Sequence, residues 1–242
     1  MRKDKFITTI SNVATFLEVV NFLRKAPEYS PKIGVITAPY GIGKTETCTW
    51  YFTQNLKNTI YISITASMNT KDIFEEILFE LGEAPKGNLN RIFKRIVDLI
   101  NLREEPPLIL LDESNRLANK ERAVEMLRDV HDLTGSAICL VGSPEFLPTI
   151  RKYHAFYSRV RIERVLKPLN LKDVKKLAKE LVETVSLTDD AVAVLKEKTN
   201  GNTRRIVITL GAVEEYARAN QKEVIDASDL KKIFALRKGL EE

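Results

Sequence analysis

Apolar residues recur along this chain with two spacings, and their order predicts strands that alternate with helices. Residues 10–20 place apolar side chains three and four positions apart, which is the spacing of a helix that buries one face. Further helical patterns lie at residues 73–81, 89–100 and 121–133. Short apolar runs, most of them rich in β-branched residues, predict strands at residues 32–37, 59–65, 108–111, 137–141 and 160–165.

Some of these strands, such as residues 108–111, are apolar throughout instead of alternating with polar residues. Strands of this kind are typical of a parallel sheet whose two faces are both covered by helices. Together with the helical patterns between consecutive strands, they predict a three-layer α/β domain with a five-stranded parallel sheet. We place this domain, including the N-terminal helix, at residues 1–167.

The pattern changes after Pro168, because no later apolar run resembles a strand. Apolar positions then recur at helical spacing, and Thr188 and Asp226 are residue types that cap the N-termini of helices. Residues 168–242 are therefore predicted to form a small all-α domain.

Composition says more about the cellular location of the protein than about its function. Lys and Arg total 38 against 33 Asp and Glu, so the net charge of +5 permits a nucleic-acid partner without requiring one. Cys48 and Cys139 lie in separate apolar stretches, and we expect both to be reduced core residues. No signal peptide and no membrane-spanning run are recognisable, which predicts a cytoplasmic protein with no membrane partner.

The clearest chemical motif is APYGIGKT at residues 38–45, which fits a phosphate-binding loop except that Ala38 replaces the first glycine. In such a loop, backbone N–H groups surround the β-phosphate of ATP and Lys44 reaches the β- and γ-phosphates. Thr45 would give its hydroxyl to Mg²⁺. The alternative is a chance surface turn. The predicted nucleotide-binding residues are Ala38, Pro39, Tyr40, Gly41, Ile42, Gly43, Lys44, Thr45 and Glu46.

A second motif places two carboxylates, Asp112 and Glu113, at the end of the apolar strand 108–111. Asp112 would bind Mg²⁺ or its water, and Glu113 would polarise the water that attacks the γ-phosphate. A solvated strand end is the alternative interpretation. Because the two motifs are independent signals, their combination predicts an ATPase with ATP and Mg²⁺ as cofactors.

Three further residues are candidates for the reaction. Ser143, at the end of the next strand, would hold the attacking water and the γ-phosphate, or is only a turn hydroxyl before Pro144. Arg159 would reach the ATP of a neighbouring subunit as an arginine finger, with Arg161 as a competing choice and a surface basic cluster as the alternative. Arg204 would sense the γ-phosphate from the helical domain, with Arg205 as its competitor.

One histidine, His131, follows Val130 in a helical pattern and has no second metal ligand nearby. We expect it at the surface or at an interface and assign it no chemistry.

Four segments are more specific than the phosphate-binding loop: LDESNRL at 111–117, MLRDVHDLTG at 126–135, LVGS at 140–143 and YSRV at 157–160. Together they resemble the AAA+ ATPases that assist DNA transposition, the phage Mu B and TnsC-like family. The likeness runs through most of the chain. It implies an AAA+ P-loop NTPase domain at residues 1–167 and a helical lid at residues 168–242.

The resemblance also implies partners. Such proteins use ATP to form helical oligomers around duplex DNA, recruit and activate a transposase, and disassemble on hydrolysis. The segment before their acidic strand faces the central channel, which makes four residues here candidates for sequence-tolerant DNA contacts: Lys86, Arg91, Lys94 and Arg95. The alternative is that the last three form the solvated face of an amphipathic helix.

The leading hypothesis is therefore an ATP-dependent DNA-binding transposition regulator that oligomerises on duplex DNA, selects the target and delivers it to a transposase. A nucleotide-gated scaffold with slow hydrolysis is one alternative, although Glu113 argues against an inactive site. An AAA+ ATPase of a secretion or signalling system, without DNA binding, is another. A replication-initiator-like ATPase is disfavoured because no winged-helix domain follows the lid.

Overall fold

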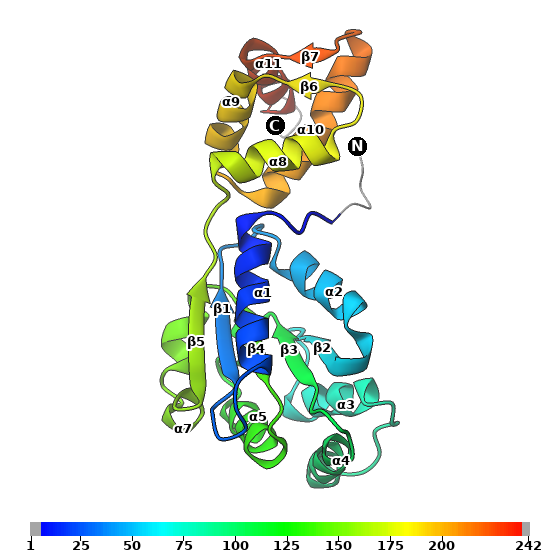
Figure 1. The fold of residues 1–242 in the computed structure, drawn as a ribbon, viewed down its shortest axis with the longest axis vertical. Helices are drawn as coiled ribbons and strands as arrows, with labels where there is room; N and C mark the ends of the chain where they lie inside the picture. The colour runs from blue at the N-terminus through cyan, green and yellow to red at the C-terminus, as the bar shows by residue number, and fades with distance from the viewer. Residues whose placement is uncertain (1–5, 239–242) are drawn as a thin grey trace. The chain divides into compact units, whose positions relative to one another are not determined.

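Five parallel strands form one sheet in the computed structural model, which describes residues 6–238 (Figure 1). The order across the sheet is β2-β3-β4-β1-β5, and every pair of neighbours is parallel. The strands are β1 (Ile33–Thr37), β2 (Thr59–Ser63), β3 (Leu108–Asp112), β4 (Ile138–Gly142) and β5 (Val160–Val165). The predicted five-stranded parallel sheet is confirmed.

The chain divides into two units, which are described separately. The larger unit comprises residues 15–39 and 44–166, and the smaller one contains residues 6–14, 40–43 and 167–238 of those described. The extreme ends of the two predicted domains, residues 1–5 and 239–242, lie outside the described residues.

The larger unit holds most of the helices. It contains α2 (Lys44–Gln54), α3 (Thr70–Glu80), α4 (Leu89–Asn101), α5 (Glu121–Thr134), α6 (Phe146–Ile150) and α7 (His154–Tyr157), with most of α1 (Ser11–Arg24). Short 3-10 turns lie at Leu56–Asn58 and Ser114–Leu117. The short helices α6 and α7 are too brief to produce a clear periodic pattern, so the hydrophobic periodicity does not resolve them.

Both faces of the sheet are covered by helices, as the apolar strands require. One face sends Val35, Ile62, Leu111 and Leu140 into a buried cluster with residues of α3, α4 and α5. On the other face α1 packs closely against β1: a side chain at Gly34 would come within 2.8 Å of the Leu23 methyl group. This close approach explains the glycine in the middle of a strand.

Helix boundaries follow local capping chemistry. Asn69 accepts hydrogen bonds from the backbone of Lys71 and Asp72, and the Asp72 carboxylate accepts one from the Asn69 backbone, forming a capping box at α3. Gly135 ends α5 in the left-handed conformation with φ 68°.

The expectation for His131 is wrong. This residue is buried near the end of α5, and its Nδ1 lies 2.8 Å from the carbonyl oxygen of Ser136. The chain turns back after Gly135, and this turn brings a hydrogen-bond partner to the imidazole that helical spacing alone does not indicate.

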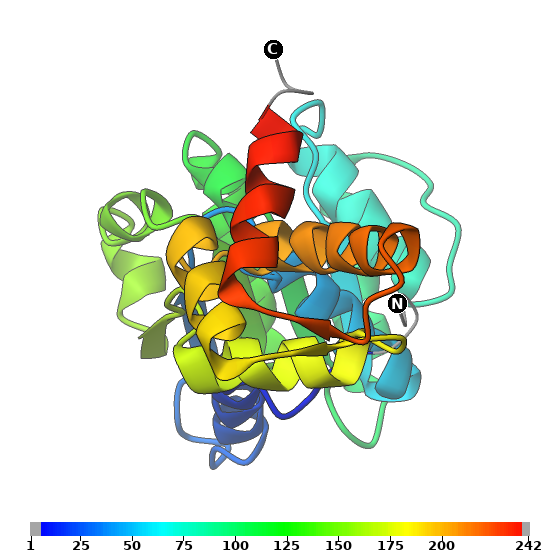
Figure 2. The same ribbon diagram turned by 90° about the horizontal axis from the view of Figure 1, so that it is seen from above.

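The smaller unit contains α8 (Leu171–Leu181), α9 (Asp189–Thr199), α10 (Thr203–Ala219) and α11 (Ala227–Lys238), which cross one another (Figure 2). Thr188 and Asp226 cap α9 and α11, as predicted. Two strands of two residues each, β6 (Ser186–Leu187) and β7 (Val224–Ile225), pair in parallel. The helical periodicity did not predict them, because two residues are too few to show an alternating pattern.

Among the described residues, no helix combines the length and the apolar character that crossing a lipid bilayer requires.

Two neighbouring positions on α3 provide a test of this packing. Ile77 is 0% exposed and Phe79 is 63% exposed. We expect Ile77→Ala to lower the free energy of unfolding by about 2 to 5 kcal/mol, since it leaves a cavity in the core. Phe79→Ala, the matched control, should change it by about 0.5 kcal/mol or less. Urea denaturation followed by circular dichroism measures both, and equal losses would contradict the predicted orientation of α3.

Candidate nucleotide-binding site

The loop after β1 has one part in the larger unit, where Lys44 turns back toward the loop itself. Its Nζ donates hydrogen bonds to the carbonyl oxygens of Ala38, at 2.7 Å, and Pro39, at 3.1 Å. The Ala38 N–H donates to the carbonyl of Gly142 at 3.0 Å, which ties the loop to the end of β4. Ala38 is not among the residues with positive φ, so its methyl group causes no backbone strain where the usual motif has glycine.

The turn formed by residues 40–43 belongs to the smaller unit, where it contacts the start of α10. The carbonyls of Tyr40, Gly41 and Ile42 accept hydrogen bonds from the Asn202 amide, the Arg204 N–H and the Thr203 hydroxyl. The φ of Gly41 is +76°, a conformation that favours glycine, and a side chain there would also meet the Asn202 amide at 2.6 Å and displace it.

Among residues 200–205, the sequence analysis predicted a role only for an arginine, Arg204 or Arg205, as a sensor of the γ-phosphate. Asn202 and Thr203 contact the loop turn and were missed, although Asn202 is also the N-cap of α10, a role that its residue type signals. Arg204 and Arg205 are both exposed, so both remain candidates for a sensor.

Asp112 is the buried centre of the acidic motif. Its Oδ2 accepts a hydrogen bond from the Thr45 hydroxyl at 2.6 Å and a longer one from the Tyr61 hydroxyl at 3.4 Å. Its Oδ1 accepts the Glu113 N–H at 2.8 Å. The structure therefore brings the predicted metal-binding residues Thr45 and Asp112 together.

These oxygen donors fit Mg²⁺, which prefers one or two carboxylates, hydroxyls, waters and substrate phosphates. Within residues 6–238 no three His, Cys, Asp or Glu side chains gather to hold a metal. Thr45 and Asp112 are the predicted residues that would hold the ion.

Glu113 adopts a left-handed backbone conformation with φ 53° and ψ 35°. This region is unfavourable for residues with a side chain, and such residues cluster at functional sites because the surrounding structure must maintain the strain. Here the Asp112 carboxylate helps to maintain it by accepting the Glu113 N–H. The predicted catalytic glutamate therefore has an unusual backbone conformation, which Asn200 and Gln221 share.

Burial and nearby carboxylates act in opposite directions on the pKa of Lys44. Burial lowers the pKa of the Lys44 ammonium, and the carboxylates of Glu113, Asp112 and Glu145 oppose that shift. Ser143 is buried at the end of β4, and its hydroxyl forms a hydrogen bond that lowers the pKa of the Glu145 carboxyl. The sequence analysis did not identify Glu145 as part of the site. Its only signal in the sequence is its position two residues after Ser143.

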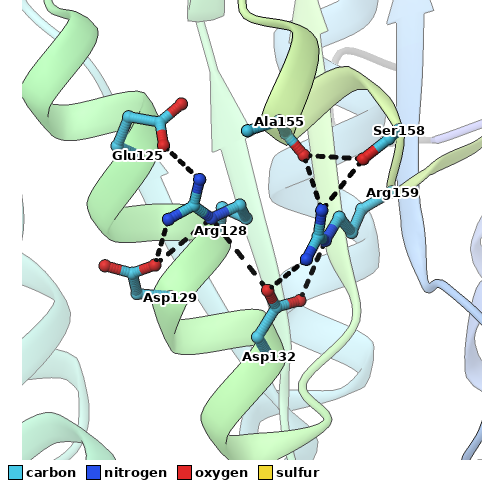
Figure 3. Close-up of polar contacts among 7 residues, drawn as sticks. All are labelled: Glu125, Arg128, Asp129, Asp132, Ala155, Ser158 and Arg159. Atoms are coloured by element: carbon cyan, nitrogen blue, oxygen red, sulfur yellow. Dashed lines mark hydrogen bonds and ion pairs between the residues drawn. The ribbon is translucent and has the colours of Figure 1, made fainter.

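The candidate finger Arg159 follows α7 and is bonded within its own unit (Figure 3). Its Nε and Nη2 donate to the two carboxylate oxygens of Asp132, at 3.3 and 2.9 Å. The competing choice, Arg161, stacks on the Phe22 ring with its guanidinium carbon 4.6 Å from the ring centre and donates to Ser30.

The candidate DNA residues lie on or beside α4. Its buried stripe is Ile92, Ile96 and Ile100, while Arg91, Lys94 and Arg95 are exposed at i, i+3 and i+4 on the other side. Lys86 is exposed in the preceding loop.

Acidic neighbours distinguish these cations. Arg95 forms an ion pair with Glu83 at 2.6 Å, and the negative charge of Asp98 also contributes to raising the pKa of Arg95. No ion pair within residues 6–238 involves Lys86, Arg91 or Lys94, so these three are the stronger candidates for a contact with phosphates.

A comparison of the sequence with protein-family models identifies the family, and the sheet order and the phosphate-binding loop agree with the result. Residues 27–150 match the family model described as AAA domain. The chain belongs to this AAA domain family. Membership implies that the protein binds and hydrolyses nucleotide, typically with Mg²⁺. No curated protein sequence matches the chain.

Solved structures share the fold of this AAA domain protein at low sequence identity. The ORC2 protein of Aeropyrum pernix, solved in ADPNP and ADP complexes, has a TM-score of 0.73 at 16% identity, covering 96% of this chain and 70% of its own. The A. pernix ORC1 protein, solved in complex with DNA, has a TM-score of 0.65 at 16% identity, covering 93% and 64%. The Thermotoga maritima RuvB Holliday junction branch migration motor has 0.60 at 16% identity, covering 93% and 68%. The chain thus spans about two thirds of these proteins.

The arrangement at Asp112 predicts a specific loss in the AAA domain. Asp112→Asn keeps the shape of the side chain but removes its charge. We expect the Mg²⁺ concentration that ATP binding requires to rise by about tenfold or more. Tyr61→Phe is the matched control, because it removes the 3.4 Å contact to Asp112 and leaves the carboxylate. Binding of a fluorescent ATP analogue titrated with MgCl₂ measures both. Unchanged Mg²⁺ dependence in Asp112→Asn would exclude this carboxylate as a ligand.

Proposed function

We infer that this protein hydrolyses ATP as a switch for assembly on duplex DNA and serves as a transposition regulator. The observation that carries the catalytic part is the buried Asp112 carboxylate, bonded to Thr45 of the phosphate-binding loop and followed by Glu113 in a strained backbone conformation. A metal-binding carboxylate and an adjacent general base at a parallel strand end are what ATP hydrolysis requires.

The proposed roles follow from chemistry and position. Lys44 would exchange its loop carbonyl partners for the β- and γ-phosphates, and Thr45 with Asp112 would hold Mg²⁺. The metal, when bound, neutralises charge on the phosphates. Glu113 would accept the proton of the attacking water. Ser143 would orient that water near the γ-phosphate, and Arg204 or Arg205 would sense the phosphate from the smaller unit.

Arg159 would complete the site of a neighbouring subunit in a homo-oligomer. An arginine supplied in trans stabilises charge on the transferred phosphoryl group, which couples hydrolysis to assembly. Arg161 stays the competing choice, and its guanidinium is stacked on Phe22.

DNA binding would use the basic face beside α4. Lys86, Arg91 and Lys94 project from one segment without acidic partners among the described residues, and long cations of this kind bind phosphates without reading sequence. Two of the proteins with a similar fold are the ORC1 protein solved in complex with DNA and the RuvB Holliday junction branch migration motor. Transposition itself is proposed from the sequence resemblance: the assembled protein would select the target, recruit and activate a transposase, and disassemble on ATP hydrolysis.

A variant of Glu113 tests the catalytic role. We expect Glu113→Gln to reduce ATP turnover by about 100-fold or more while ATP binding persists, since the general base is lost. Assemblies formed with ATP should then persist instead of dissolving. Phosphate release and electron microscopy with and without long duplex DNA measure the two effects. Turnover at the wild-type rate would refute the role of Glu113.

Replacing basic residues tests the DNA face. We expect the double variant Arg91→Gln, Lys94→Gln to weaken binding to unrelated duplexes equally and to reduce the salt slope by about 1 per cation removed. The control is Lys57→Gln, Lys152→Gln, which removes the same charge from exposed lysines elsewhere in the larger unit.

Fluorescence anisotropy at several salt concentrations measures the affinities. A shift of equal size in the control would mean that net charge alone is responsible. If the wild-type protein bound no DNA at low salt in any nucleotide state, the DNA role would be excluded and a scaffold or a secretion or signalling ATPase would be favoured.

A further inference from the structure

The candidate finger Arg159 is almost fully occupied by partners in its own subunit. Its Nη1 donates to the Ala155 carbonyl at 3.1 Å and to the Ser158 hydroxyl at 2.9 Å, while Nε and Nη2 donate to Asp132 (Figure 3). A guanidinium has five N–H groups. One on Nε, two on Nη1 and one on Nη2 are used within residues 6–238, which leaves a single N–H on Nη2.

One free N–H is too little for the work of a finger. Arginine recognises phosphate through two parallel N–H groups, and its strength at such sites depends on that geometry. Arg159 must therefore give up Asp132, its backbone partner or its serine partner before it can bind a phosphate in this way. Of these, Asp132 is the charged competitor, because its carboxylate offers the same paired oxygens that a phosphate would.

Asp132 is itself shared between two arginines. The Nε of Arg128, one turn earlier on α5, lies 4.0 Å from Oδ2 of Asp132, the same oxygen that accepts the Arg159 Nη2 hydrogen bond (Figure 3). Arg128 is also bonded to Glu125 and to Asp129, the latter at 2.6 Å. When Arg159 leaves, Arg128 therefore remains to balance the charge of Asp132.

We propose that Asp132 is a positioning residue that holds Arg159 within the isolated subunit, and that Arg128 competes for Asp132 and so eases the release of Arg159 during assembly. This inference rests on the proposed role of Arg159 as a finger in trans. Asp132 and Arg159 are 35% and 37% exposed, so solvent weakens their attraction. A weak hold suits a contact that a neighbouring subunit must replace.

The proposal predicts opposite effects from two neutralising substitutions. Asp132→Asn frees Arg159, so half-maximal ATPase activity should require up to about fivefold less protein, which is the range for an exposed ion pair. Arg128→Gln removes the competitor, so Asp132 holds Arg159 more firmly and more protein should be needed. Loss of a merely structural network would move both variants in the same direction.

The experiment measures ATP hydrolysis per subunit across a range of protein concentrations, at low and high salt, without DNA. Glu76→Gln is the control, since it removes one charge from an exposed position on α3. Arg159→Ala is measured in parallel and should be inactive at all concentrations while it still binds ATP. Higher salt should reduce both shifts, because screening weakens the ion pairs.

The outcomes separate this inference from the proposed function. If Arg159→Ala is inactive but Asp132→Asn and Arg128→Gln do not shift, or shift in the same direction, the positioning role is wrong and the finger role stands. If Arg159→Ala keeps wild-type activity, the finger role fails and the inference fails with it.

Discussion

The hydrogen bond between the Thr45 hydroxyl and the buried Asp112 carboxylate is the interaction on which the candidate site depends. A buried carboxylate is costly unless its oxygens are satisfied, and here one oxygen takes the Thr45 hydroxyl while the other takes the Glu113 N–H. The same contacts join the phosphate-binding loop after β1 to the end of β3. Satisfying one buried charge therefore also brings the metal-binding and catalytic candidates together.

The strand order makes this contact possible. β4 lies between β1 and β3, so the residues that follow these three strands meet at one edge of a parallel sheet. Ala38 is bonded to the end of β4, and Ser143 is buried just beyond it. The apolar interiors of the strands, covered on both faces, keep this edge fixed while its polar residues carry the chemistry.

Away from that edge, arginines are arranged by competing carboxylates. Arg95 is paired with Glu83, which leaves Arg91 and Lys94 as the less compensated cations of α4. Arg159 is paired with Asp132 in the same way. A cation's availability to phosphate therefore depends on the acids around it as well as on its own exposure.

The sequence by itself predicted five parallel strands, most of the longer helices and the two nucleotide motifs. Apolar periodicity and the motifs built from Gly, Lys, Thr and Asp are local signals, because each depends on residues that are close together in the sequence. Only the tertiary structure decided that Asn202 contacts the phosphate-loop turn, that Glu145 is hydrogen-bonded to Ser143, and that Arg159 is held by Asp132. Local sequence patterns do not predict these contacts. The packing of whole helices and strands determines which polar side chains come together.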